Sequence, residues 1–211
     1  VGNDRPDHKR VYKNDGKGAF ALDGTFGEPT WATRNVTVVE LTGDGLPEIV
    51  VANRNPKNQS ANYICINGGN GTFAECRELS TESATTIASG DFNSDGFADL
   101  IVPHRDRGQS YVYINDGKGG FADRRAVGPA ESSTRSVAVA DLNGDSHQDI
   151  LIGDPHAGGV RVYLNDGNAD FAASFALGED MGHVYAIAVA DIDGDGVPDI
   201  VAARSDAPNF V

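Results

Sequence analysis

A 12-residue stretch rich in acidic residues recurs four times along the chain at a nearly constant spacing. The copies begin at Glu40, Asp91, Asp141 and Asp191, so that successive starts lie 51, 50 and 50 residues apart. They read ELTGDGLPEIVV, DFNSDGFADLIV, DLNGDSHQDILI and DIDGDGVPDIVA. Because a fixed internal period indicates a fold built from repeated units, this spacing restricts the architecture more than any other feature.

A second motif recurs with the same period but out of phase with the first. It begins at Tyr12, Cys65, Tyr113 and Tyr163 and reads YKNDGKGAF, CINGGNGTF, YINDGKGGF and YLNDGNADF. Triplets such as Asn-Asp-Gly accept the positive φ angles of tight hairpin turns. Each repeat is therefore expected to contain a β-hairpin in addition to the acidic stretch.

The pattern within one repeat indicates four short strands. RSVAVADL alternates Val137 and Val139 with Ala138 and Ala140, which is the period of two expected for a strand. DILIG after the acidic stretch, GVRVYL before the hairpin turn and FAASFAL after it supply the other three. Four strands in about 50 residues are typical of a β-propeller blade. The sequence therefore predicts an all-β fold, a single β-propeller domain over residues 1–211.

The repeat units correspond approximately to residues 1–50, 51–101, 102–151 and 152–201, and residues 202–211 re-enter the repeat. The first eleven residues, VGNDRPDHKRV, align with the last eleven, VAARSDAPNFV. One blade completed by strands from both ends would close a four-bladed ring and remove exposed sheet edges. Alternatively, the four repeats are part of a larger propeller. The sequence leaves both arrangements open.

Each acidic stretch offers side-chain oxygens at positions one, three, five and nine, counted from its first acid, and a backbone carbonyl at position seven. Calcium binds six to eight oxygen ligands in flexible geometry, and a glycine-bearing loop can wrap around it. We therefore expect up to four structural Ca²⁺ ions, one in each loop. The predicted ligands are Glu40, Thr42, Asp44, Leu46 and Glu48; Asp91, Asn93, Asp95, Phe97 and Asp99; Asp141, Asn143, Asp145, His147 and Asp149; and Asp191, Asp193, Asp195, Val197 and Asp199.

The four loops are not equally suited to a cation. The fourth offers four aspartates, whereas the first has longer acids and only a hydroxyl at Thr42, and the third has Ser146 where the others have Gly. An EF-hand is excluded because it requires a bidentate Glu at position twelve and flanking helices. Two alternatives to a metal site remain for these loops. They could be Asx-type turns without an ion, or they could carry catalytic carboxylates, which would need to converge in one pocket.

The loop pattern D-x-[DN]-x-D-G-x-x-D, repeated over essentially the whole chain, resembles the FG-GAP or VCBS repeats of integrin α-subunit propellers and of many secreted or surface proteins. This resemblance implies a propeller with calcium held in loops on one face, a role in adhesion or ligand recognition, and an extracellular location. Such propellers usually have seven blades, whereas this chain supplies four repeats. Glu40, Thr42 and Ser146 depart from the pattern.

The formal net charge of −14 argues against nucleic-acid binding. No apolar run reaches the roughly 18 residues of a membrane span, so no membrane insertion is expected. Neither a G-x-S-x-G nor an H-E-x-x-H motif occurs, and we predict that the chain is not an enzyme. The expected function is an extracellular adhesion, recognition or assembly module with a protein or glycan ligand, and self-assembly if the ring is incomplete. Alternatives are a secreted lectin or the non-catalytic part of a larger secreted enzyme.

Covalent features agree with a secreted protein. Cys65 and Cys76 flank a hairpin turn, so they are expected either to form a cross-strand disulfide, which would fit an oxidising compartment, or to remain two thiols. Asn35, Asn58 and Asn70 occur in Asn-x-Ser/Thr sequons and are candidate glycosylation sites.

Other candidate binding residues lie away from the acidic loops. Charged loops of variable sequence follow the second strand of each repeat, and such loops on a rigid scaffold are where binding usually occurs. Trp31, Arg34, Arg135 and Tyr185 come just before the first strand of their repeats, towards the end opposite the acidic loop. Their expected role is either core packing or ligand contact.

Overall fold

The computed structural model describes residues 7–54, 61–155, 159–178 and 182–205. In these residues the chain forms sixteen strands and no helix, and all pairings between strands are antiparallel. The predicted all-β class is therefore confirmed. Within the described ranges there is no helix that could cross a membrane.

Three four-stranded sheets form the middle of the molecule, and in each of them strands that are consecutive in sequence are neighbours. This arrangement agrees with the four strands predicted for one repeat. The first sheet contains β3 (Thr33–Val39), β4 (Glu48–Asn53), β5 (Asn62–Ile66) and β6 (Glu75–Ser80); the second contains β7 (Ala88–Gly90), β8 (Asp99–Val102), β9 (Gly108–Ile114) and β10 (Asp123–Ser132); the third contains β11 (Ser136–Ala140), β12 (Asp149–Asp154), β13 (Gly159–Leu164) and β14 (Ala173–Leu177).

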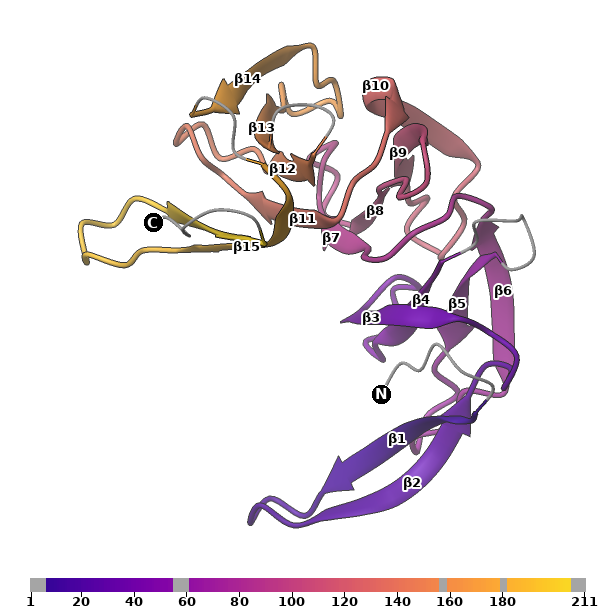
Figure 1. Ribbon diagram of the computed structural model, residues 1–211. Coiled ribbons are helices and arrows are strands. Elements are labelled where there is room, and N and C mark those ends of the chain that lie inside the picture. The colour runs from indigo at the N-terminus through magenta and orange to yellow at the C-terminus, as the bar shows by residue number, and fades with distance from the viewer. Residues whose placement is uncertain (1–6, 55–60, 156–158, 179–181, 206–211) are drawn as a thin grey trace.

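Two hairpins lie at the ends of the arc that the sheets form (Figure 1). The N-terminal hairpin is β1 (Lys9–Asn14) and β2 (Phe20–Phe26), which correspond to the third and fourth strands of a repeat; the C-terminal hairpin is β15 (Val184–Ala190) and β16 (Asp199–Arg204), which correspond to the first and second. They form separate two-stranded sheets. The closed four-bladed ring is therefore not formed in this structure, because successive sheets turn too little for four repeats to bring the hairpins together (Figure 1).

The first strands of the repeats line the concave side of the arc, where β3 contacts β7, β7 contacts β11, and β11 contacts β15 (Figure 1). The second strands of the three complete sheets are buried along their whole length. Because both faces of such a strand are covered, its sequence is a continuous apolar run rather than an alternation.

The hydrophobic core lies between successive sheets. Leu41 and Val50 of the first sheet pack with Leu100 and Tyr113 of the second, and equivalent clusters join the second sheet to the third, the third to the C-terminal hairpin, and the N-terminal hairpin to the first. Within the first sheet, Cys65 and Cys76 lie opposite each other on β5 and β6 and form a disulfide. Each repeat therefore depends on its neighbours for burial, as is usual in repeat proteins.

The terminal hairpins expose residues whose counterparts are buried in the complete sheets. Tyr12 is 45% exposed, whereas Tyr113 and Tyr163 are each 5% exposed. Ile192 is 52% exposed, whereas Phe92 at the same place in the repeat is fully buried. In the complete sheets these side chains pack against a neighbouring repeat, Tyr113 against the one before it and Phe92 against the one after it. Among the described residues no such neighbour covers Tyr12 or Ile192.

The asparagine of the hairpin motif ties the second and third sheets to the repeat before each of them, whereas Asn67 of the first sheet donates to Pro47 of its own repeat. The Asn115 side-chain amide donates to the backbone carbonyl of Leu41 in the preceding sheet at 3.0 Å, and the Asn165 amide donates to that of Phe92 at 2.9 Å. Their side-chain oxygens accept backbone N–H groups of their own turns. Asn14 makes the same turn contacts but is exposed.

This difference gives a stability prediction. Asn115→Ala should lower the free energy of unfolding by about 2 to 4 kcal/mol, because it leaves buried carbonyls without a donor and also removes the turn contacts. Asn14→Ala should cost less than about 1 kcal/mol, since it loses only exposed turn contacts. Urea unfolding of the monomeric protein measures both values. Equal losses in the two variants would show that the bond between sheets contributes nothing.

Candidate metal centre

The acidic loops all connect the first strand of a repeat to the second, and they share one backbone conformation. Positions four and six have φ angles in the left-handed region, with values of 82° at Gly194 and 86° at Gly196 in the fourth loop. In the second and third loops one of these positions is a serine, with φ of 60° at Ser94 and 72° at Ser146. The left-handed region disfavours residues with a Cβ, so these two loops carry a local backbone cost that the fourth avoids.

Backbone N–H groups orient the acidic side chains of the fourth loop. The Asp191 carboxylate accepts hydrogen bonds from Gly194 N–H at 2.7 Å and Gly196 N–H at 2.9 Å. Asp193 accepts one from Asp195 N–H at 3.1 Å, and Asp195 accepts one from Val197 N–H at 2.8 Å. The second and third loops repeat these contacts at positions one, three and five, which explains why Asp or Asn recurs there.

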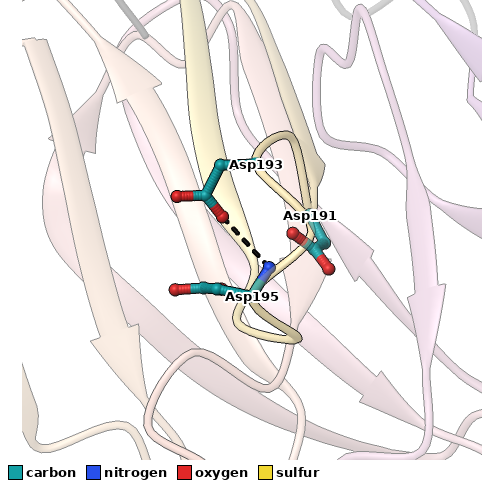
Figure 2. A group of neighbouring side chains, drawn as sticks. All are labelled: Asp191, Asp193 and Asp195. Carbon is teal, nitrogen blue, oxygen red and sulfur yellow. Dashed lines mark hydrogen bonds between the residues drawn. The ribbon is translucent and has the colours of Figure 1, made fainter.

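Three carboxylates of the fourth loop come together at the surface. Asp191, Asp193 and Asp195 are exposed, and one oxygen from each lies within 4.8 Å of the others (Figure 2). Like charges at this distance repel one another, and a hard cation that prefers oxygen ligands would neutralise them. The donor set, all oxygen on a glycine-bearing loop, therefore fits Ca²⁺.

The other loops place fewer charges together. In the second and third loops position three is an asparagine, and its amide donates to the aspartate at position five at 2.8 Å, from Asn93 to Asp95 and from Asn143 to Asp145. In the first loop Glu40 accepts the N–H groups of Thr42 and Gly43. Among the described residues, only the fourth loop brings three carboxylates within the spacing expected of metal ligands.

The acid at position nine has a structural role that the sequence interpretation did not predict. Asp99 is fully buried, and its carboxylate accepts the N–H groups of Phe92 at 2.9 Å and Asn115 at 2.8 Å. Asp149 makes the equivalent pair of contacts, and Glu48 and Asp199 accept the N–H at position two of their loops. The sequence signal was that apolar residues follow this acid directly, which places it as the first residue of a buried strand.

Burial raises the pKa of the acid at position nine in three of the four loops. Loss of solvent raises the pKa of Asp99 to about 6, and the nearby charges of Asp95 and Asp91 act in the same direction. Burial also raises the pKa of Asp149 and of Glu48. At exposed Asp145, by contrast, the hydrogen bond from His147 N–H lowers the pKa.

The remaining predicted residues lie as follows. Leu46, Phe97, His147 and Val197 occupy position seven, and each N–H donates to the aspartate at position five. Of the sequon asparagines, Asn35 lies half-buried in β3, Asn70 is exposed in the β5–β6 turn, and Asn58 falls outside the described residues.

The acidic loops also mark where the chain matches a known repeat family. The FG-GAP-like repeat family matches residues 40–102, 91–152 and 141–202, and every match begins at the first acid of a loop and ends in the second strand of the next repeat. The chain belongs to this family. The resemblance inferred from the loop pattern is thus confirmed, and the FG-GAP-like repeats account for the middle of the molecule.

No curated protein sequence matches the chain. Among solved structures, the crystal structure of the V. cholerae biofilm matrix protein Bap1 is similar, with a TM-score of 0.47 and 21% sequence identity. The similarity covers 89% of this chain and 26% of Bap1, so the chain spans much less than the full length of that protein.

The buried acid of the second FG-GAP-like repeat gives a pH prediction for the metal-free protein. The pKa of Asp99 is about 6 in the folded chain and about 3.9 in an unfolded one, so the folded state binds this proton more tightly. The resulting stabilisation is complete below the unfolded pKa and is lost as the pH rises through the folded value.

Urea unfolding in the presence of a chelator should therefore show that stability falls more steeply with rising pH, from about 4 to about 7, in the wild type than in Asp99→Asn. Identical pH dependence of the two proteins would contradict the assignment of Asp99 as a buried ionisable group.

Proposed function

We propose that the chain is a calcium-stabilised recognition module of an extracellular protein, in which the FG-GAP-like repeats form a section of a β-propeller. The observation that carries the proposal is the exposed group of Asp191, Asp193 and Asp195 in a loop that recurs four times. The disulfide between Cys65 and Cys76 supports an oxidising compartment.

The fourth loop would hold the cation through the Asp191, Asp193 and Asp195 carboxylates, with the Val197 carbonyl and Asp199 as further proposed ligands. The ion would supply positive charge that offsets the clustered acids. Because it binds the folded loop better than the unfolded chain, it would stabilise the connection between β15 and β16 by mass action. The other three loops are proposed calcium sites of lower affinity, since they present fewer charges.

Recognition of a protein is favoured over recognition of a glycan by the environment of Trp31. This side chain is 8% exposed and stacks on Tyr63, with 4.0 Å between ring centroids and 9° between ring planes. A buried indole is a poor open platform for a sugar ring. The equivalent positions in the other repeats, Glu82, Ser132 and Gly182, are not aromatic, so the repeats offer no matching set of sugar-stacking residues.

Calcium should raise the melting temperature of chelator-treated protein. At 100 times the dissociation constant the gain in stability is about 2.7 kcal/mol, which corresponds to about 5 to 10 °C for a chain of this size. Asp195→Asn should remove more than half of this gain, whereas Asp166→Asn, an exposed aspartate outside the acidic loops, should keep it.

Glu48→Gln separates the two roles of the acidic loops. Because Glu48 is buried and accepts Leu41 N–H, the variant should melt at a lower temperature with or without calcium and retain most of the calcium-dependent gain. A wild type whose melting temperature does not respond to calcium would remove the metal proposal. A gain lost equally in Glu48→Gln and Asp195→Asn would overturn the ranking of the fourth loop above the first.

A second proposed function is assembly, in which β16 of one copy pairs with β1 of a second copy. In the complete sheets Leu100 lies opposite Tyr113, and Ile150 lies opposite Tyr163. The repeat places Ile200 and Tyr12 at the corresponding positions of β16 and β1. Such pairing would complete a four-stranded sheet and cover the exposed Tyr12, and unpaired strand edges are known templates for this kind of contact.

Light scattering tests the assembly proposal. The wild-type mass should increase with concentration, and Tyr12→Glu should remain monomeric because a charge would be buried in the joint sheet. Phe175→Glu is the matched control: Phe175 is an exposed apolar residue on the outer strand β14 of a complete sheet, so this variant should assemble like the wild type. A monomeric wild type at every concentration would refute assembly and leave the calcium proposal untouched.

A further inference from the structure

A basic pocket lies at the end of the inner strands opposite the acidic loops. Its volume is about 330 Å³, within the range of small-molecule sites. The lining residues are Arg34, Arg54, Thr85, Arg105, Arg135 and Tyr185.

The pocket is assembled from four successive units of the fold. Arg34 is the second residue of β3, and Arg54 directly follows β4. Arg135 directly precedes β11, and Tyr185 is the second residue of β15. Because β3, β7, β11 and β15 follow one another along the concave side (Figure 1), residues at the start of these strands converge although they are far apart in sequence.

Four arginines lie among the described residues that line the pocket. None of the described lining residues is acidic. Asp106 pairs with Arg54, with Oδ1 to Nη2 at 3.0 Å, and lies 3.9 Å from Arg105 Nη1. Two guanidinium groups therefore share one carboxylate. Burial lowers the pKa of Arg105, and the positive charges of Arg135 and Arg54 lower it further.

Two lining residues of the pocket each carry a buried polar atom with no hydrogen-bond partner among the residues that the structure describes. The Arg135 guanidinium lies over the Tyr185 ring, 4.5 Å from its centroid, and its Nε is buried without an acceptor. The Thr85 hydroxyl is also buried without a partner. Because an unsatisfied buried polar group is costly and rare, an acceptor oxygen of a ligand that reached either group would offset that cost.

We propose that this pocket binds a small carboxylate ligand, either a free organic acid or a single acidic sugar residue. Guanidinium groups present paired donors that match the two oxygens of a carboxylate, and the Thr85 hydroxyl can donate a further hydrogen bond. A long polyanion fits less well, since the net charge of −14 would repel its remaining charges. The proposal does not depend on calcium binding.

Isothermal titration calorimetry of the whole chain, with glucuronate, succinate and glucose as probes, tests the proposal. Glucuronate should bind saturably and glucose should not. Arg105→Gln and Arg135→Gln should each weaken glucuronate binding by about tenfold or more, because a charge-assisted hydrogen bond is lost. Arg125→Gln, which alters an exposed arginine paired with Asp123 at 2.8 Å on β10, should bind like the wild type.

Thr85→Val keeps the test meaningful if the arginine variants fold poorly. The substitution removes a hydroxyl that has no partner among the described residues, so it should leave the melting temperature unchanged or raised while weakening glucuronate binding several-fold. Binding of both acids would support recognition of the carboxylate alone, and binding of glucuronate only would support an acidic sugar. Absence of binding by both acids, or unchanged binding in all three pocket variants, would overturn the proposal.

Discussion

The hydrogen bond from a hairpin asparagine to a carbonyl in the preceding acidic loop sets how the repeats stack. Asn115 reaches Leu41, and Asn165 reaches Phe92. The acceptor is position two of the acidic loop in both cases, so each bond joins the same two points of adjacent repeats. At these two junctions the asparagine motif supplies the amide and the acidic loop supplies the carbonyl. The hydrophobic clusters between sheets then form around a fixed register.

One acidic loop combines two kinds of carboxylate that experience different surroundings. The aspartates at positions one and five are exposed or partly exposed and accept hydrogen bonds from the loop's own N–H groups. Asp99 at position nine is the first residue of β8 and is buried. The buried acid links the start of the loop to Asn115, which directly follows β9, and its burial raises its pKa. The loop conformation is therefore coupled to the core of its own sheet, and any ion that orders the loop also acts on the strands next to it.

Local chemistry explains which features could be predicted from the sequence. The strand pattern around Val137 and Val139 and the turn at the Asn-Asp-Gly triplets depend on neighbouring residues, and they were predicted correctly. Ring closure could not be decided, because the period of 50 residues does not determine the rotation between sheets. The role of Asp99 was missed because it depends on a contact within its own sheet, with Asn115, which lies 16 residues further along the chain. Arg135 was a candidate for ligand contact, but its convergence with Arg105 in one pocket depends on the stacking of the repeats.

The two proposed sites lie at opposite ends of the same inner strands, and their separation determines whether they influence each other. A strand of six or seven residues is about 20 Å long, roughly twice the Debye length of about 10 Å at 0.1 M salt. The charge of a cation in the acidic loop is therefore largely screened at the arginine pocket. Calcium would stabilise the sheets that position the arginines without tuning their electrostatic attraction for an anion. Ligand preference would then be set by the residues at the pocket end, which are free to vary while the acidic loops keep their common pattern.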